Sequence, residues 1–458
     1  MKSETKREMR PRIVVLGAGL AGLSAAWHLA RQSPDLSRIV LEKDDSAGGL
    51  CRSRSVDGFT FDYTGHYLHL RDPAMTAWVE RLLGDELVEV ERRSLIQSHG
   101  VRLEFPFQAN LHGLPPELVA RCLIDFVRAS DDLAPPNDAA EPFGRWARRV
   151  FGDGIAEAFM IPYNAKLFGV DADELTSEWV AWAVPRPDLE QVVRGALGIA
   201  NRGMGYNPRF RYPRCGGIGS LPAALAECVA DDLQLGAPVA RIDAAGRRVQ
   251  LADGREFAYE RLISTLPLAE LLHRIEGLVT PGGAPPLSQI AARLRWTAVI
   301  DVGLGIDRPE IAGGAHWIYF PEPEYPFYRA GFPSNVCRAM APEGCSSISV
   351  EFSQRPDRPR PSHDELVAAA RGGLERAGLL SPEDRIVLST EALIDPAYVI
   401  FDAERTRLVD EALARLDEAG ILSIGRFGAW TYSYMERALI DGKTAAERVA
   451  AALTPAAR

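Results

Sequence analysis

A glycine-rich turn close to the start of the chain constrains its fold more than any other feature. The apolar run Arg12–Leu16 stops at Gly17, and the six residues Gly17-Ala18-Gly19-Leu20-Ala21-Gly22 have the spacing GxGxxG. Apolar residues at helical spacing follow, and a second short apolar run, 38–41, ends at Glu42. This order predicts a strand, a tight turn, a helix and a parallel strand.

Each glycine of the turn has a physical role in binding a dinucleotide. Gly17 permits the tight turn, Gly19 lets the backbone approach a pyrophosphate, and Gly22 allows the helix to pack closely on the strand. The pyrophosphate then lies at the positive N-terminus of the helix, beside Leu20 and Ala21. The sequence therefore predicts a Rossmann-type α/β domain.

The acid at the end of the second strand narrows the choice of cofactor. Glu42 stands twenty residues after Gly22, where a carboxylate binds ribose hydroxyls and would repel the 2′-phosphate of NADP. NAD and FAD remain. Gly48-Gly49-Leu50, shortly after Glu42 and Lys43, is typical of FAD domains of the glutathione-reductase kind, so we predict FAD.

Length and composition limit the class of protein. A chain of 458 residues is long enough for two or three domains of ~100–200 residues each. The net charge of −10 argues against a general nucleic-acid binder but allows a local site for an anionic small substrate. The six cysteines have no CxxC or CxxH spacing, which predicts no disulfide framework, no metal site and a reduced, cytoplasmic setting. No stretch reaches ~18 apolar residues, so we expect no membrane span.

Apolar periodicity divides the rest of the chain. Residues from about 79 to 200 are expected to be mostly helical, and strands are expected to dominate from about 295 to 352. We therefore expect an FAD-binding domain made of three pieces, a mainly helical insertion, and a strand-rich substrate domain with an antiparallel sheet. The corresponding ranges are 1–78, 213–267 and 395–458 for the FAD domain, 79–212 for the insertion, and 268–394 for the substrate domain.

Several blocks along nearly the whole chain carry a resemblance to a known family. They are Phe61-Asp62-Tyr63-Thr64-Gly65-His66, Phe105-Pro106-Phe107-Gln108, the block 159–169, the block 207–219, Trp317-Ile318-Tyr319-Phe320, Phe327-Tyr328-Arg329, and the block 425–432. In order and spacing the chain resembles the flavin-dependent UDP-galactopyranose mutases, especially the longer eukaryotic-like members, within the amine-oxidase superfamily.

The resemblance implies an isomerase. In the family's reaction, N5 of the reduced flavin attacks the anomeric carbon of a UDP-sugar and displaces UDP, and the opened sugar recloses from pyranose to furanose. The protein supplies orientation and electrostatics, and no net redox change occurs. The resemblance therefore also implies that the flavin must first be reduced, with NADPH or NADH as possible reductants.

The resemblance also assigns residues to roles. His66, Arg329, Tyr398 and Tyr432 match catalytic positions, and the last three match, with Tyr319, the residues that hold the diphosphate. Phe105, Gln108 and Phe159 match the uracil site, and Tyr163, Asn164 and Asn207 lie beside the sugar. Gly65 and His66 would face the flavin, Gly425, Arg426 and Met435 would lie near it, and Val239 would contact adenine.

Three departures from the family bear on the substrate. Ala183 stands where a second diphosphate-binding arginine is expected, although Arg186 follows three residues later. Thr64 replaces a glycine, and Ser433-Tyr434-Met435-Glu436 replaces the carboxylate or amide expected just after Tyr432. Loss of one arginine contact to a charged group costs on the order of 1.5–3 kcal/mol, enough to disable a mutase or to indicate another substrate.

Two other functions stay open on the sequence alone. The shared superfamily fold also suits a true oxidoreductase, such as an amine oxidase or a desaturase-like enzyme that passes hydride to flavin. A flavoprotein that binds a nucleotide sugar but has lost catalysis is the third reading.

Overall fold

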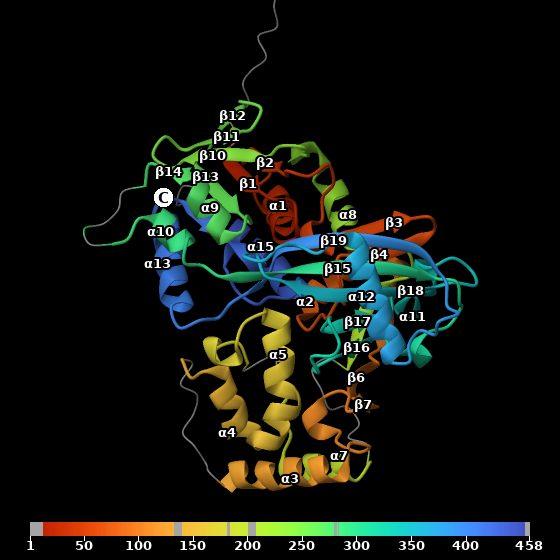
Figure 1. Ribbon diagram of the computed structural model, residues 1–458. Helices are drawn as coiled ribbons and strands as arrows, with labels where there is room; N and C mark the ends of the chain where they lie inside the picture. Colours follow the sequence, from red (N-terminus) through yellow and green to blue (C-terminus); the bar gives the residue numbers. More distant parts are fainter. Residues whose placement is uncertain are drawn as a thin grey trace, which may run out of the picture.

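The computed structural model describes residues 12–131, 140–180, 184–199, 208–278, 282 and 284–453. It contains one parallel sheet flanked by helices, one large mixed sheet, and a group of helices at the end opposite to the parallel sheet (Figure 1). The predicted α/β class is confirmed.

The parallel sheet begins with the predicted strand, turn, helix and strand. Its strand order is β20-β13-β1-β2-β9, and every neighbouring pair is parallel. The helices α1 (Leu20–Gln32) and α15 (Met435–Leu453) pack against each other beside it. The strands are β1 (Ile13–Leu16), β2 (Arg38–Leu41), β9 (Leu233–Gln234), β13 (Arg261–Ser264) and β20 (Ile421–Ser423).

A second sheet has seven strands in the order β19-β15-β18-β17-β16-β6-β7. The helix α12 (His363–Arg376) covers one of its faces, where its residues Leu366 and Leu374 join the buried side chains of Val302 and Val350. The strands are β6 (Ser94–Ser98), β7 (Val101–Glu104), β15 (Trp296–Ile306), β16 (Trp317–Tyr319), β17 (Arg329–Gly331), β18 (Ser346–Gln354) and β19 (Ile386–Val399).

The helical group lies at the lower end of the view in Figure 1. Its members are α3 (Pro116–Asp131), α4 (Phe143–Ile155), a π-helical turn at Ala156–Met160, α5 (Ile161–Phe168) and α7 (Leu189–Ala196). These helices lie within the range 79–200 that the sequence predicts to be mostly helical.

The remaining elements connect these parts. The other helices are α2 (Pro73–Leu83), α8 (Ser220–Cys228), α9 (Leu268–Arg274), α10 (Leu287–Ala291), α11 (Pro333–Val336), α13 (Arg405–Glu418) and α14 (Gly425–Gly428). The other strands are β3 (Ser53–Val56), β4 (Phe59–Asp62), β5 (Leu87–Glu91), β8 (Arg209–Pro213), β10 (Val239–Asp243), β11 (Arg248–Leu251), β12 (Glu256–Ala258) and β14 (Ile275–Glu276).

The expectation that 79–200 is mostly helical is wrong for its first part. The strands β5, β6 and β7 occupy much of 87–104, and β6 pairs in parallel with β16 of the seven-stranded sheet. The apolar residues of β7 alternate with polar ones, and the β6–β7 hairpin turns at His99 and Gly100, both with positive φ. Such a turn favours a hairpin over a helix.

The long strand β19 was not anticipated either. It crosses residue 395, so a boundary between the substrate domain and the last piece of the FAD domain at that residue would cut a continuous strand. The five-part division of the chain stays a proposal.

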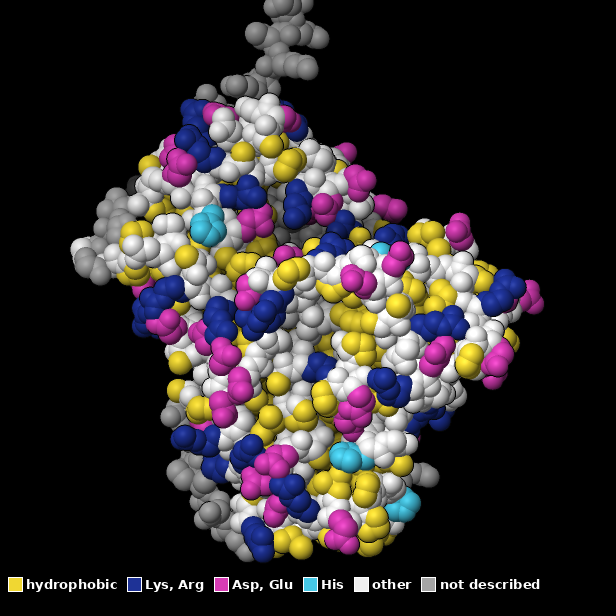
Figure 2. Space-filling model, viewed as in Figure 1, with side chains coloured by type: hydrophobic (Ala, Val, Ile, Leu, Met, Phe, Trp, Pro, Cys, Tyr) yellow, Lys and Arg dark blue, Asp and Glu magenta, His cyan; other side chains and the backbone are white. Residues whose placement is uncertain are grey.

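Two observations concern the surface and the cysteines. Basic and acidic side chains are interspersed over the face in Figure 2. Within the described part of the chain, no helix combines the length and apolar character that crossing a bilayer requires. All six cysteines carry free thiols.

Candidate functional site

The glycine turn between β1 and α1 is tightly packed. Gly17 has a φ of +93°, a conformation that L side chains rarely adopt. A Cβ on Gly22 would lie 1.9 Å from the carbonyl oxygen of Gly17, so only glycine permits this approach of helix to turn. Gly19 caps the N-terminus of α1 without a side chain, which leaves the positive end of the helix accessible to an anion.

Glu42 is held in place at the end of β2. Its Oε2 accepts a hydrogen bond of 2.7 Å from the backbone amide of Ala18, and its Oε1 accepts one of 3.0 Å from the amide of Asp44. A carboxylate has about four lone-pair positions, so two such bonds leave capacity for hydroxyl donors. The geometry suits a ribose beside the turn.

A cavity of about 470 Å³ opens along this turn. Twelve of the fourteen predicted cofactor residues line it, whereas Gly22 lies behind it in the helix packing and Gly65 lines the neighbouring cavity. The twelve are Gly17, Gly19, Leu20, Ala21, Glu42, Lys43, Gly49, Leu50, Val239, Gly425, Arg426 and Met435.

A second cavity, of about 260 Å³, adjoins the first. It is lined by the four predicted catalytic residues and by Tyr319. Both cavities share wall residues, among them His66 and Arg426, so these two side chains stand where the cavities meet. The remaining shared residues are Leu50, Ile394, Ser433, Tyr434 and Met435.

His66 is a neutral imidazole at this junction. Burial, followed by the positive charges of Arg426 and Arg329, lowers its pKa to about 4. Its Nδ1 has no hydrogen-bond partner within the described residues. A buried ring nitrogen without a partner is costly, which favours a ligand or water beside it.

Arg329 is paired with a carboxylate that the sequence did not indicate. Its Nε and Nη2 each lie 2.8 Å from an oxygen of Glu351, and the hydroxyl of Tyr328 donates to the same carboxylate at 2.5 Å. Glu351 is only 1% exposed. The pairing keeps the guanidinium charged and fixes its orientation on the cavity wall.

The two predicted phenols lie together beside Arg426. The rings of Tyr398 and Tyr432 stack at 6.0 Å, and the guanidinium of Arg426 lies 4.8 Å from the centre of the Tyr432 ring. Arg426 also donates to the carbonyl groups of Ser433 at 2.7 Å and Ala397 at 3.1 Å. Burial raises the pKa of both phenols, so each is a protonated donor at neutral pH.

The residues predicted for uracil and sugar form a separate aromatic cluster next to this cavity. Phe159 stacks on Phe107 at 5.1 Å and on Tyr163 at 5.3 Å, and Tyr163 meets Tyr319 edge-on at 5.3 Å. These rings reach the cavity through Tyr319 and through Tyr328, whose ring meets that of Tyr163 edge-on at 6.5 Å. Their role in binding uracil stays a proposal.

Three other predicted substrate residues make contacts within the protein. Phe105 packs on Tyr319 at 5.4 Å, and the side-chain amide of Asn164 donates to the carbonyl of Met160 at 2.8 Å. The amide nitrogen of Gln108 donates to Pro185, whereas its Oε1 has no partner in the described part of the chain. That oxygen is a buried acceptor with capacity for a ligand donor.

The departures from the family pattern have mixed outcomes. Ala183 and Asn207 lie outside the described residues, as does Trp182 of the same segment. Arg186 does not join the cavity wall, because its guanidinium lies over the ring of Trp146 at 5.3 Å. Thr64 has a φ of +66°, the backbone region in which glycine is easier to place.

Glu436 turns away from the substrate cavity. Its Oε1 accepts the backbone amides of Arg71 at 2.6 Å and Asp72 at 2.7 Å, next to the start of α2. It therefore does not replace the acid expected after Tyr432.

The sequence reading missed several residues of the cavity. Arg92 lines it, with its guanidinium 4.8 Å from the Phe105 ring and 5.8 Å from the Trp317 ring. Burial lowers the pKa of Arg92. The pair Arg92-Arg93 directly after β5 was the only sequence feature that could have drawn attention to it. Tyr67, His69 and Trp317 complete this side of the wall.

A family comparison decides the assignment of the fold. The family described as flavin containing amine oxidoreductases matches residues 20–450, nearly the whole chain. The chain belongs to this family. Like its members it is a flavoprotein, and the predicted likeness to UDP-galactopyranose mutases is confirmed by a solved structure of the reduced mutase. That structure is 31% identical, with a TM-score of 0.90, and the match covers 97% of this chain and 96% of the other.

Curated relatives within this amine oxidoreductase family have other activities. A zeta-carotene-forming phytoene desaturase of Myxococcus xanthus is 26% identical over 395 residues, 74% of this chain and 71% of the relative. Polyamine oxidase 2 of Arabidopsis thaliana is 23% identical over 342 residues, 70% of this chain and 62% of the relative.

The residues present fit FAD. The glycine cradle at Gly17 and Gly22 has no room for side chains, and Glu42 is fixed beside it. His66, whose Nδ1 has no partner among the described residues, lines both cavities. The first cavity would hold the dinucleotide, and His66 with Arg426 would lie beside the flavin ring.

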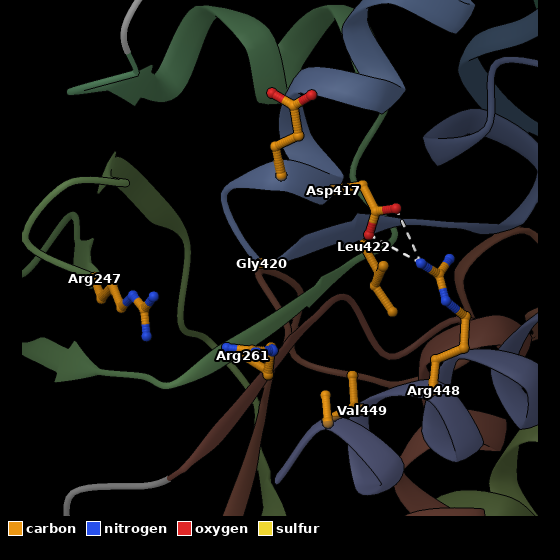
Figure 3. Close-up of a pocket in the computed structure, with 9 residues that line it drawn as sticks. Arg247, Arg261, Asp417, Gly420, Leu422, Arg448 and Val449 are labelled. Carbon is orange, nitrogen blue, oxygen red and sulfur yellow. Dashed lines mark hydrogen bonds and ion pairs between the residues drawn. The ribbon is translucent and has the colours of Figure 1, made fainter.

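A further cavity lies at the amino end of the parallel sheet, away from these residues (Figure 3). It is walled by Arg247, Arg261 and Arg448, and Arg448 is paired with Asp417 at 3.0 Å. Ligands of open α/β sheets bind at the opposite, carboxyl end of the strands. No group of three potential metal-ligating side chains occurs among the described residues.

Proposed function

We propose that the chain is a flavin-dependent, mutase-like isomerase that converts a nucleotide-linked sugar, resembling UDP-galactopyranose, between pyranose and furanose forms. One observation carries the proposal. Arg329, Tyr319, Tyr398 and Tyr432 line one cavity, and that cavity meets the dinucleotide cavity at His66 and Arg426. A diphosphate held by the first set would place its sugar toward the flavin.

The chemistry of the wall supports an anionic diphosphate. Arg329 offers a fixed cation, and the protonated phenols of Tyr398 and Tyr432 offer hydrogen-bond donors. Arg92 adds a second guanidinium to the same cavity. It comes from a different part of the chain than residue 183, where the family pattern would place an arginine.

The residues around the flavin support the same reaction. The reduced flavin, when bound, supplies the nucleophile for the anomeric carbon. His66, neutral at pH 7, avoids adding a positive charge beside it, and Arg426 lies close enough to the phenols to keep them oriented. The similarity to a reduced UDP-galactopyranose mutase over 97% of the chain supports the assignment.

The test is a product analysis with the flavin-loaded protein. The protein is reduced with dithionite and incubated with UDP-galactopyranose and related nucleotide sugars, and the products are separated by chromatography. A furanose product that is absent with the oxidised protein is expected. No furanose from any of these sugars would overturn the proposal. NADPH and NADH are compared with dithionite to identify the reductant.

A second function is favoured by the curated relatives, which include a desaturase and a polyamine oxidase. In this alternative a substrate C–H or amine is oxidised, hydride passes to the flavin, and oxygen takes up the electrons. Bleaching of the oxidised flavin by a polyamine or by an unsaturated hydrocarbon, without any nucleotide sugar, would support it. Tight nucleotide-sugar binding without turnover would instead indicate a binding protein.

We also propose a cytoplasmic setting. The six free thiols support it, since reduced cysteines are usual in that compartment.

A further inference from the structure

Four polar side chains form a row across four neighbouring strands of the seven-stranded sheet. Asp301 of β15 is directly opposite Glu351 of β18, which is opposite Arg329 of β17, which is opposite Tyr319 of β16. Directly opposed residues of neighbouring strands project from the same face of a sheet. We call Asp301, Glu351, Arg329 and Tyr319 the polar row.

One end of the polar row lies on the substrate cavity and the other end is buried. Arg329 and Tyr319 line the cavity, whereas Glu351 is 1% exposed and Asp301 is 3% exposed. Glu351 is fully engaged by Arg329 and by the hydroxyl of Tyr328. The polar row therefore contains two carboxyl groups, those of Glu351 and Asp301, but only one guanidinium, that of Arg329.

Asp301 also contacts the loop that carries His66. The hydroxyl of Ser349 donates to its Oδ1 at 2.5 Å, and the backbone amide of Thr64 lies near enough to the same carboxyl group to lower its pKa. Thr64 has a positive φ and is two residues before His66. Asp301, at the buried end of the polar row, thus lies between the strands that carry Arg329 and the loop that carries His66.

We propose that Asp301 is a positioning residue whose ionisation weakens binding of the nucleotide diphosphate at Arg329. With Asp301 neutral, the charges of Arg329 and Glu351 cancel. With Asp301 ionised, the polar row carries one net negative charge directly behind the diphosphate. The inference rests on the proposed function, because it takes a diphosphate as the ligand of Arg329.

The groups that face Asp301 place its titration near neutrality. Burial and the charge of Glu351 raise its pKa, whereas Ser349, the amide of Thr64 and the charge of Arg329 lower it, and the balance is a pKa of about 7. On the other side, β19 presents Ala392, which carries no charge. At the end of β4, the acid Asp62 lines one small cavity with Thr64 and Ser349, and it accepts hydrogen bonds from Ser53, Tyr212 and the amide of Ile218. Asp301 is therefore neutral below this value and ionised above it.

The direction of the effect follows. As pH rises from 6 to 8.5, Asp301 loses its proton, the polar row becomes negative, and affinity for the diphosphate falls. Coulomb's law at an effective dielectric constant of about 20 predicts a loss of roughly fifteenfold for two unit charges roughly 10 Å apart.

The experiment measures the dissociation constant of UDP-galactose for the oxidised, FAD-loaded protein by calorimetry at several pH values from 6 to 8.5. UDP-galactose is the suitable probe, because its diphosphate is a diester without a proton that titrates in this range. Asp301→Asn imitates the neutral acid and keeps a carbonyl oxygen that can accept the hydroxyl of Ser349. We expect its affinity to be independent of pH and equal to that of the unmodified protein at pH 6.

Asp402→Asn is the matched control. Asp402 is a half-buried aspartate whose pKa is also raised, chiefly by burial, but it does not line either cavity. The pH dependence should persist in this variant. Ser349→Ala tests the role of Asp301 while its carboxyl group stays in place. The substitution removes a hydrogen bond that stabilises the ionised carboxylate, so the pKa of Asp301 rises. The midpoint of the affinity change should therefore move to higher pH.

The outcomes separate the two proposals. If the unmodified protein binds no UDP-galactose at any pH, the proposed function fails, and this inference fails with it. If it binds with an affinity that does not change with pH, or if Asp301→Asn keeps the full pH dependence, only the role of Asp301 is overturned.

Discussion

The guanidinium of Arg329 is held along one edge by the carboxylate of Glu351, with two donor–acceptor distances of 2.8 Å. The exposed fractions of the two side chains are 17% and 1%. A charge pair so far from solvent has a large desolvation cost, and it persists because both partners and the hydroxyl of Tyr328 satisfy each other. Arg329 is therefore oriented before any ligand arrives.

This pairing predicts a non-additive effect on stability. Arg329→Ala leaves Glu351 buried without a counter-charge, which should cost about 3–5 kcal/mol. Arg329→Ala combined with Glu351→Ala removes both charges, so the double variant should be more stable than the sum of the single losses predicts. Thermal unfolding of the four proteins measures this.

The exposed pair of Arg355 and Asp357 is the control for the same substitution. Its side chains are 43% and 61% exposed, so Arg355→Ala should cost less than about 1 kcal/mol. Equal losses at Arg329 and Arg355, or strictly additive losses at Arg329 and Glu351, would contradict the picture of a buried pair.

The glycine turn predicts a defect in cofactor binding. Gly22→Ala would place a Cβ 1.9 Å from the carbonyl oxygen of Gly17, so α1 must move away from the turn. We expect the purified variant to contain little flavin, measured by its visible absorbance relative to protein. Gly372→Ala, in α12, is the control, because nothing lies within 4 Å of its added Cβ and alanine favours a helix. Full flavin content in Gly22→Ala would contradict the role of the turn.

The sequence predicts local features of this fold well and distant ones poorly. The turn at Gly17, the helix after it and Glu42 lie within about thirty residues, so their spacing defines their geometry. The polar row depends on the register between strands around 301, 329 and 351, and no local pattern contains that register. Glu351 and Asp301 were therefore not foreseen, although Arg329 was found through a family resemblance.

Alternation was the feature that the sequence reading underused. The hairpin at 94–104 was taken for part of a helical segment, although the apolar residues of β7 alternate and its turn contains Gly100. The hairpin matters because β6 pairs with β16, which carries Tyr319 and Trp317 of the cavity.

The buried His66 predicts a loss of stability in acid. Its pKa in the folded protein is about 4, below the ordinary value of 6.5 that it regains on unfolding. As pH falls from 6.5 to 4, the unfolded chain takes up the proton first, so the folded state loses stability across this window. His66→Gln removes the imidazole that takes up this proton. The variant should therefore lose less stability between pH 6.5 and 4 than the unmodified protein.

Thermal unfolding at pH 7 and at pH 5 measures the difference. His112→Gln is the control, because His112 lies at the surface. We expect the His66→Gln protein to show a smaller fall in melting temperature between the two pH values, by an amount equivalent to about 1 kcal/mol or more. Identical falls in all three proteins would mean that folding does not lower the pKa of His66.

The two stacked phenols predict a selective loss of diphosphate affinity. If Tyr398 and Tyr432 donate hydrogen bonds to the diphosphate, Tyr398→Phe and Tyr432→Phe should each weaken UDP binding by about 1.5–3 kcal/mol, since the acceptor is charged. Uridine, which has no phosphate, should bind each variant as it binds the unmodified protein.

Tyr259→Phe is the control, because its buried hydroxyl has no partner within the described residues and it lines neither cavity. Calorimetry with UDP and with uridine separates the cases: equal losses for both ligands would show that the two hydroxyls do not act on the phosphates, and would contradict their role as diphosphate donors.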